Sequence, residues 1–182
     1  RVNDKASADR AHRIALVGLR GAGKSTLGRM LADKLGYPFV ELNRLVEREY
    51  GASVSALIEM SSVNAFRRYE RKCLERVLAD NDKVVIATAG GIVASADTYA
   101  LLLQRTHTVW VQARPQEHMS RVMEQGDFRP MAKNREAMAD LVAILEARRA
   151  DYAQAEAELD TSGESVDGSA KRLWKLVQGW TR

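Results

Sequence analysis

A glycine-rich segment that ends in a lysine and two hydroxyl residues carries the clearest chemical signal in this sequence. The segment has the spacing Gly18-x4-Gly23-Lys24-Ser25. Glycines let the backbone turn its N–H groups around an anion, the N-terminus of a following helix adds partial positive charge, and Lys24 can reach terminal phosphates. The hydroxyl of Ser25 is placed to bind Mg²⁺. The spacing predicts a phosphate-binding P-loop with nucleotide contacts from Gly18, Gly21, Ala22, Gly23, Lys24, Ser25 and Thr26.

The elements around this segment are those that a P-loop requires. An apolar strand over residues 13–17 precedes it, and Leu27, Leu31 and Leu35 follow at helical spacing, with Gly36 as the stop. A glycine-rich turn that binds no ligand is the alternative interpretation. That alternative gives no reason for a lysine and a serine at the positions that a P-loop needs.

Apolar runs alternate with helical patterns along the rest of the chain. Strands are expected at residues 13–17, 38–42, 83–88, 108–112 and, more weakly, 158–160. Helices are expected at residues 24–34, 43–50, 54–60, 64–79, 96–104, 115–124, 136–152 and 169–180. This alternation predicts the α/β class, with a five-stranded parallel sheet in a three-layer α/β/α P-loop fold. Residues 125–134 fit neither period and are rich in charge, glycine and proline, so we expect a mobile lid over the phosphates there.

Composition points to a single globular domain. The chain has 182 residues, 46% of them hydrophobic, and no apolar run approaches the ~20 residues of a membrane span. The lone Cys73 excludes an internal disulfide framework and fits the reducing cytoplasm, and its helical surroundings favour a core position over a nucleophile. The net charge of +4 favours anionic ligands, but basic and acidic residues are interleaved, so charge alone does not indicate DNA binding.

The polar residues 1–12 are expected to be a linker remnant, and residues 13–182 the folded domain. A linker at this place would fit the carboxy-terminal domain of a longer protein. A processed or tagged amino terminus is the alternative.

The P-loop and five further motifs, in this order and spacing, resemble the shikimate kinase family over residues 13–180. Besides the P-loop, they are Glu41-Leu-Asn43 after the second strand, Phe66-Arg67-Arg68-Tyr69-Glu70 on a helix, Ala89-Gly90-Gly91 after the third strand, Arg129-Pro130 in the lid, and Arg148 with Tyr152 on the following helix.

The resemblance implies a role for several of these side chains. Arg67 and Arg148 would bind an acidic group of the second ligand, because a guanidinium suits a carboxylate bidentately, and Glu70 would orient Arg67. Arg129 would close on the nucleotide phosphates. Residues 160–163, Asp-Thr-Ser-Gly, would face the adenine. The implied cofactor is Mg²⁺ with ATP or ADP, with Ser25 and Glu41 as the metal-binding residues.

Three positions depart from the family pattern. Asn43 replaces the second aspartate of the Asp-x-Asp motif, the expected proton acceptor, and an amide can orient a hydroxyl but has no useful basicity. Asn43 could also simply cap the helix that follows it. Glu41 replaces the first aspartate and could still bind Mg²⁺ through water. Ala89 opens the usual triple-glycine turn, where its Cβ would crowd the backbone or exclude a positive φ.

These departures resemble a narrower group, the shikimate-kinase-like effector domain of benzoyl-CoA-responsive transcriptional repressors. The resemblance implies an acyl-CoA effector, DNA bound only through a helix-turn-helix domain absent from these residues, and a homodimer. The effector or substrate would contact Glu41, Asn43, Arg67, Gly90, Gly91 and Arg148.

We therefore expect a ligand-sensing regulatory domain without catalytic activity. An active shikimate kinase is the alternative, with Lys24 and Arg129 as catalytic residues, because phosphoryl transfer depends on positioning and charge more than on a base. Other P-loop kinases of nucleotides or sugars come third, since they lack arginines placed like Arg67 and Arg148.

Overall fold

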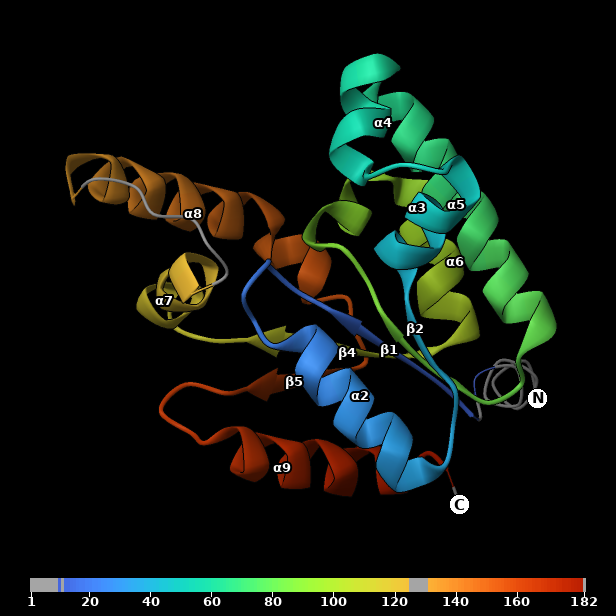
Figure 1. Cartoon of the computed structure of the whole chain (residues 1–182). Coiled ribbons are helices and arrows are strands. Elements are labelled where there is room, and N and C mark those ends of the chain that lie inside the picture. The colour runs from blue at the N-terminus through green and yellow to red at the C-terminus, as the bar shows by residue number, and fades with distance from the viewer. Residues whose placement is uncertain (1–9, 11, 125–130, 182) are drawn as a thin grey trace.

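The computed structural model describes residues 10, 12–124 and 131–181 (Figure 1). Nearly all of the expected linker 1–12 lies outside these residues, so the domain boundary after residue 12 stays a prediction. Six residues of the expected lid, 125–130, lie outside them as well, including Arg129.

One parallel sheet organises the molecule, as predicted. Its strands stand in the order β2-β3-β1-β4-β5, which places the strand before the P-loop in the middle. Ala15 of that strand pairs with Ile86 on one side and Thr108 on the other. The strand bounds are β1 Arg13–Val17, β2 Phe39–Glu41, β3 Val84–Ala87, β4 His107–Gln112 and β5 Ala157–Asp160.

Helices cover both faces of the sheet (Figure 1). On one face lie α2 Lys24–Leu35 and α9 Val166–Gln178. On the other lie α3 Leu42–Tyr50, α5 Val63–Asp80 and α6 Ala96–Arg105, with α4 Val54–Met60 packed on α3 and α5. The short 3₁₀ helix η1 Gly90–Ala94 follows β3, and α7 Pro115–Glu124 packs against α8 Met131–Tyr152.

Alternation along the strands divides the core between the two faces. Ile14 and Leu16 pack with α2 and α9, whereas Ala15 and Val17 pack with the helices opposite. Both sets are fully buried, because a parallel sheet is covered on each side. Cys73 belongs to the second set and is buried, as its helical pattern predicted.

Several element boundaries differ from those expected, and three of the differences bear on the site. Strand β2 ends at Glu41, so Leu42 already begins a helix, and η1 forms where no helix was expected. Helix α8 begins at Met131 instead of residue 136 and takes up part of the expected lid. Residues 131–136 are mostly good helix formers, and this propensity outweighs the missing apolar period.

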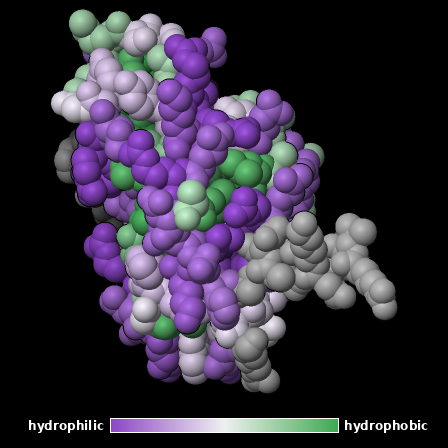
Figure 2. All heavy atoms as spheres, turned by 90° about the vertical axis from the view of Figure 1, so that its right-hand side faces the viewer, coloured by the Kyte–Doolittle hydropathy of each residue, from purple (hydrophilic) through white to green (hydrophobic). Residues whose placement is uncertain are grey.

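The outer surface beside α5 and α6 is largely hydrophilic, with small hydrophobic areas between the hydrophilic side chains (Figure 2). Among described side chains, Met60 and Val63 are large hydrophobic residues exposed at the adjoining ends of α4 and α5. None of the described helices combines the length and the apolar character needed to cross a membrane.

Candidate active site

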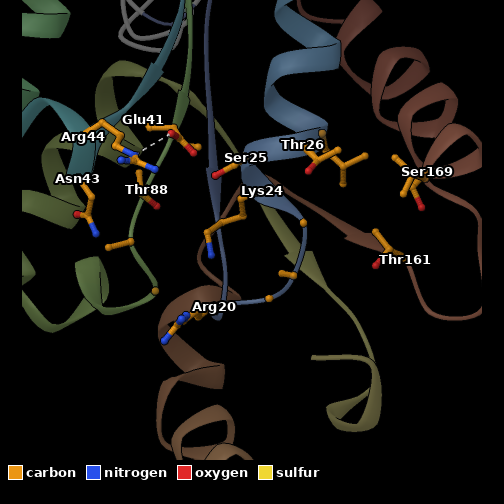
Figure 3. Close-up of a pocket in the computed structure, with 18 of the residues that line it drawn as sticks. Arg20, Lys24, Ser25, Thr26, Glu41, Asn43, Arg44, Thr88, Thr161 and Ser169 are labelled. Atoms are coloured by element: carbon orange, nitrogen blue, oxygen red, sulfur yellow. Dashed lines mark ion pairs between the residues drawn. The ribbon is translucent and has the colours of Figure 1, made fainter. Parts of the chain in front are cut away.

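A cavity of about 790 Å³ opens where β1, β2 and β3 end and their following helices begin (Figure 3). The carboxyl ends of parallel strands meet at one edge of the sheet, which brings distant segments together. The cavity is lined by residues 20–27 of the P-loop and α2, by Glu41, Asn43, Arg44 and Glu47 from the start of α3, by residues 87–90, and by Thr161, Glu164, Val166 and Ser169.

The P-loop has the geometry that its glycines predict. Gly18 has φ of +141°, and a Cβ at this position would overlap the carbonyl oxygen of Val111 on β4. Gly21 and Gly23 also have positive φ, and Gly23 precedes α2 without any side-chain cap. The first N–H groups of α2 are therefore left for an anion, and Ser25 and Thr26 line the cavity beside them.

Lys24 is held by its own loop. The side chain is 8% exposed, and its Nζ donates hydrogen bonds to the carbonyl oxygens of Gly18 at 2.5 Å and Leu19 at 2.9 Å. Burial, and secondarily the charge of Arg148, lowers the pKa of Lys24 to about 7. A phosphate in this cavity would stabilise the protonated form of Lys24 and compete with the two carbonyl oxygens for its ammonium group.

Two further side chains support the loop. His118 on α7 accepts a hydrogen bond from the backbone N–H of Ala113 through Nε2, so its Nδ1 carries the proton and donates to the carbonyl oxygen of Arg20 at 3.1 Å. Thr88, just after β3, donates its hydroxyl to the carbonyl oxygen of Leu16 at 2.9 Å. The backbone around the phosphate site is thereby tied to β3 and α7.

A second cluster combines two arginines with the turn after β3. Arg67 donates through Nη1 to both oxygens of Glu70, at 3.0 and 3.3 Å, and the Glu70 side chain is 0% exposed. Burial raises the pKa of Glu70, while Arg67 opposes the shift. Tyr152 donates its hydroxyl to the carbonyl oxygen of Gly90 at 2.5 Å, which fixes α8, and with it Arg148, against this turn.

The turn itself requires small residues where the arginines approach. A Cβ at Gly91 would overlap Nη2 of Arg67 and lie 3.5 Å from Nη2 of Arg148. A Cβ at Gly90 would lie 3.5 Å from Nη1 of Arg148. Ala89, in contrast, has φ of −72°, which agrees with the expectation that its Cβ excludes a positive φ at this residue. The conformation at residue 89 is extended and suits any residue.

The start of α3 differs from the expected helix cap. Glu41 is the N-cap residue and makes no side-chain capping bond, whereas Asn43 is the second residue inside the helix, so the capping interpretation of Asn43 was wrong. The Oδ1 atom of Asn43 is buried and finds no hydrogen-bond partner among the described residues. Such an acceptor is available to a hydroxyl group of a ligand.

Oxygen donors for Mg²⁺ lie in the same cavity as Lys24. Ser25 and Glu41 both line it, and the described residues contain no group of three His, Cys, Asp or Glu side chains that could enclose a metal. Mg²⁺ usually takes one or two protein ligands and completes its shell with phosphates and water. These residues fit that mode of binding.

The structure brings most of the predicted site residues together. The P-loop residues, Glu41, Asn43 and Gly90 line or border one cavity, and Arg67, Gly91 and Arg148 lie behind Gly90. Arg129 lies outside the described residues. Thr161, from the predicted adenine-facing loop, lines the far end of the cavity.

Several cavity residues were missed by sequence reasoning. Thr88, Ser169 and Arg44 line the cavity, and His118 supports it. Thr88 could have been noticed as a polar residue at the end of a buried strand, and Arg44 as a cation in the first turn of a helix. Ser169 and His118 carry no comparable local signal.

Comparison with known proteins gives a consistent result. The family model described as shikimate kinase matches residues 20–178. The shikimate kinase of Moorella thermoacetica is 34% identical over 167 residues, covering 92% of this chain and 95% of that protein. That of Caulobacter vibrioides is 37% identical over 160 residues, covering 88% and 79%.

Solved structures agree with this result. The shikimate kinase from Bacteroides thetaiotaomicron has a TM-score of 0.83 at 30% identity, with 92% of this chain and 98% of that chain covered. The shikimate kinase from Acinetobacter baumannii, solved in complex with shikimate, has a TM-score of 0.82 at 28% identity, with 96% and 97% covered.

These relatives overturn the regulatory function expected from the sequence. They are shikimate kinases over most of both chains, so the expectation of a ligand-sensing domain of a transcriptional regulator was wrong. Nothing supports the acyl-CoA effector, the DNA partner, the homodimer or the loss of catalysis. The error arose because Glu41 and Asn43 were weighted above the rest of the site, although two exchanged side chains leave the P-loop and both arginines unchanged.

Proposed function

Because this chain belongs to the shikimate kinase family, we propose that it transfers the γ-phosphoryl group of ATP to a hydroxyl group of shikimate. The observation that carries the proposal is the arrangement of the site. A P-loop with a buried lysine lies next to two arginines that converge on the turn at Gly90 and Gly91. One group of residues suits phosphates and the other suits a carboxylate.

The nucleotide is bound by the P-loop in this proposal. Backbone N–H groups of the loop and of the first turn of α2 donate to the phosphate oxygens, and Lys24 exchanges its two carbonyl partners for them. Ser25 and Glu41 would hold Mg²⁺, which supplies charge neutralisation for the phosphates. Arg129 would add a further positive charge from the lid, and this role stays a prediction.

Shikimate is bound on the other side of Gly90. Its carboxylate is placed between the guanidinium groups of Arg67 and Arg148, which can form bidentate, charge-assisted hydrogen bonds. Buried Glu70 keeps Arg67 in place and Gly91 leaves room for its Nη2. The free Oδ1 of Asn43 accepts a hydrogen bond from a shikimate hydroxyl and orients it.

The reaction does not require a strong base at residue 43. The transition state of phosphoryl transfer is loose, so the attacking hydroxyl carries little positive charge until late in the reaction. Positioning by Asn43 and charge stabilisation by Lys24 then supply most of the acceleration. Asn43 is therefore compatible with an active kinase.

The proposal is tested by following shikimate-dependent release of ADP in a coupled assay with ATP and Mg²⁺. We expect turnover by the wild-type protein. Arg148→Gln is expected to raise KM for shikimate by roughly tenfold or more, because a hydrogen bond to a charged group is worth ~1.5–3 kcal/mol.

Arg149→Gln is the matched control for this test. Arg149 is the next residue on α8, is exposed and pairs with Glu146 at 3.0 Å, so its loss should leave KM unchanged. Absence of shikimate-dependent turnover in the wild-type protein, or equal effects of the two variants, would contradict the proposed function.

A further inference from the structure

Arg44 is a cation of the cavity lining that the proposed mechanism has not used. It lies in the first turn of α3, and its side chain is 75% exposed and lines the same cavity as Lys24 (Figure 3). A cation at the N-terminus of a helix opposes the helix dipole, typically by ~0.3–1 kcal/mol. The stability of α3 therefore does not explain an arginine at this position.

The present partner of Arg44 holds it only weakly. Its Nε lies 3.7 Å from Oε2 of Glu41, which is within ion-pair range and beyond hydrogen-bond distance. Ion pairs with such an exposed member contribute ~0–1 kcal/mol. A ligand with more negative charge than one carboxylate can displace Glu41 from Arg44.

The other two carboxylates of the cavity have stronger partners. Glu47 accepts the backbone N–H of Val54 at 2.9 Å. Glu164 accepts the hydroxyl of Ser169 at 2.9 Å and a guanidinium N–H of Arg172 at 2.8 Å. Arg44 and Glu41 are thus the charged pair of the described cavity lining that is most easily rearranged.

We propose that Arg44 is a substrate-binding residue that contacts the γ-phosphoryl group of the nucleotide, exchanging the carboxylate of Glu41 for phosphate oxygens. The proposal rests on the nucleotide half of the proposed function. The start of α3 borders the cavity across from the P-loop, so Arg44 lines the same cavity into which a phosphoryl group would extend from Lys24 toward Asn43. A planar guanidinium binds two phosphate oxygens at once.

Exchange of Glu41 for phosphate oxygens at Arg44 would also favour phosphoryl transfer. It frees the carboxylate of Glu41 from its arginine partner while the phosphates enter, and it adds positive charge on the side of the γ-phosphoryl group that faces the acceptor. The acceptor carboxylate already has Arg67 and Arg148 behind Gly90. We therefore assign Arg44 to the nucleotide and not to shikimate.

The experiment compares two nucleotides by calorimetry in the presence of Mg²⁺. Arg44→Gln should weaken binding of β,γ-imido-ATP by roughly tenfold or more and that of ADP by less than about twofold, because only the former has a γ-phosphoryl group. Arg48→Gln is the matched control, since Arg48 lies one turn further along α3, is exposed and does not line the cavity. It should change neither affinity.

A second measurement, made without Mg²⁺, tests the exchange with Glu41. Glu41→Gln should strengthen β,γ-imido-ATP binding more in the Arg44 background than in the Arg44→Gln background, because only the former has a guanidinium group to release. Equal gains in both backgrounds would mean that Glu41 only repels the phosphates, and this result would contradict the exchange at Arg44.

Three results overturn the assignment. They are an unchanged affinity for β,γ-imido-ATP in Arg44→Gln, an equal loss for both nucleotides, and an effect confined to KM for shikimate. If the wild-type protein binds nucleotides but does not phosphorylate shikimate, the proposed function fails, and the comparison of the two nucleotides still decides the role of Arg44.

Discussion

Lys24 combines burial with a lowered pKa, and this combination makes the stability of the protein depend on pH at a single residue. Its pKa is lowered to about 7, first by burial and then by Arg148. A lysine in the unfolded chain keeps a pKa of about 10.4. Between pH 7 and pH 10 the unfolded chain therefore binds one more proton at this residue than the folded protein, so stability rises with pH in this range.

The Lys24→Met variant isolates this effect. The methionine cannot bind a proton, so it is free of the penalty for burying a charge, and the variant should gain most over the wild type at or below pH 7. Relative to the variant, the free energy of unfolding of the wild type should rise by up to about 1.4 kcal/mol per pH unit between pH 7 and pH 9. Urea unfolding of both proteins at these two pH values gives the difference, and a constant difference would show that Lys24 stays charged.

Asn43 shows how far a residue can be interpreted before its surroundings are known. The sequence predicted a site position for it because it follows a strand, and the structure places it in the lining of the same cavity as the P-loop. It could not reveal that Oδ1 is buried without a partner, because that depends on the packing of α3. An asparagine at this position does lack the basicity of an aspartate, but this single difference was not sufficient to infer a regulatory function.

At the scale of elements, the P-loop depends on a close approach between β1 and β4. Gly18 needs both its positive φ and its lack of a Cβ, because the carbonyl oxygen of Val111 occupies the space where a Cβ would lie. Gly36, at the end of α2, has a positive φ of 71° with no atom within 4 Å of that position. An alanine at Gly36 would therefore introduce backbone strain alone, whereas an alanine at Gly18 would introduce both backbone strain and steric overlap.

We expect Gly36→Ala to lower the free energy of unfolding by roughly 1–2 kcal/mol, the usual penalty for a left-handed residue with a Cβ. Gly18→Ala should lower it clearly more, because the overlap adds to the same strain, and it should also weaken ADP binding. Urea unfolding and calorimetry measure both effects. Equal destabilisation by the two variants would show that β4 moves aside without cost.

The elements that the sequence predicted well are those with a strong period. All five strands and every expected helix except the start of α8 were predicted within a few residues, since apolar runs and amphipathic patterns report burial directly. Helix η1 was missed because its first two residues are glycines, which favour no helix. In the structure the hydroxyl of Tyr152 donates a hydrogen bond to the carbonyl oxygen of Gly90 in this helix. That contact joins residues far apart in the chain.

At the scale of the whole molecule, strand order assembles the site. Residues from the P-loop, the start of α3 and the start of α9 meet because the carboxyl ends of β1, β2 and β5 lie at one edge of the sheet. Motif order along the chain predicted this meeting for the P-loop, Asn43 and Gly90. It could not predict Ser169 or His118, whose positions follow only from how α9 and α7 pack.

Trp110 stacks on Tyr152, and its fluorescence should therefore respond to ligand binding at the turn that Tyr152 contacts. The ring centroids lie 5.6 Å apart, and the tyrosine hydroxyl is bonded to Gly90 beside the proposed position of shikimate. Trp174, which packs under Lys34 on the opposite face of the sheet, is separate from this contact. Shikimate should therefore change the intrinsic fluorescence, and Trp110→Phe should abolish the change whereas Trp174→Phe retains it. A fluorescence change that persists in Trp110→Phe would mean that another tryptophan responds to shikimate. The emission of Trp110 thus reports whether a ligand reaches the turn at Gly90, without any assay of turnover.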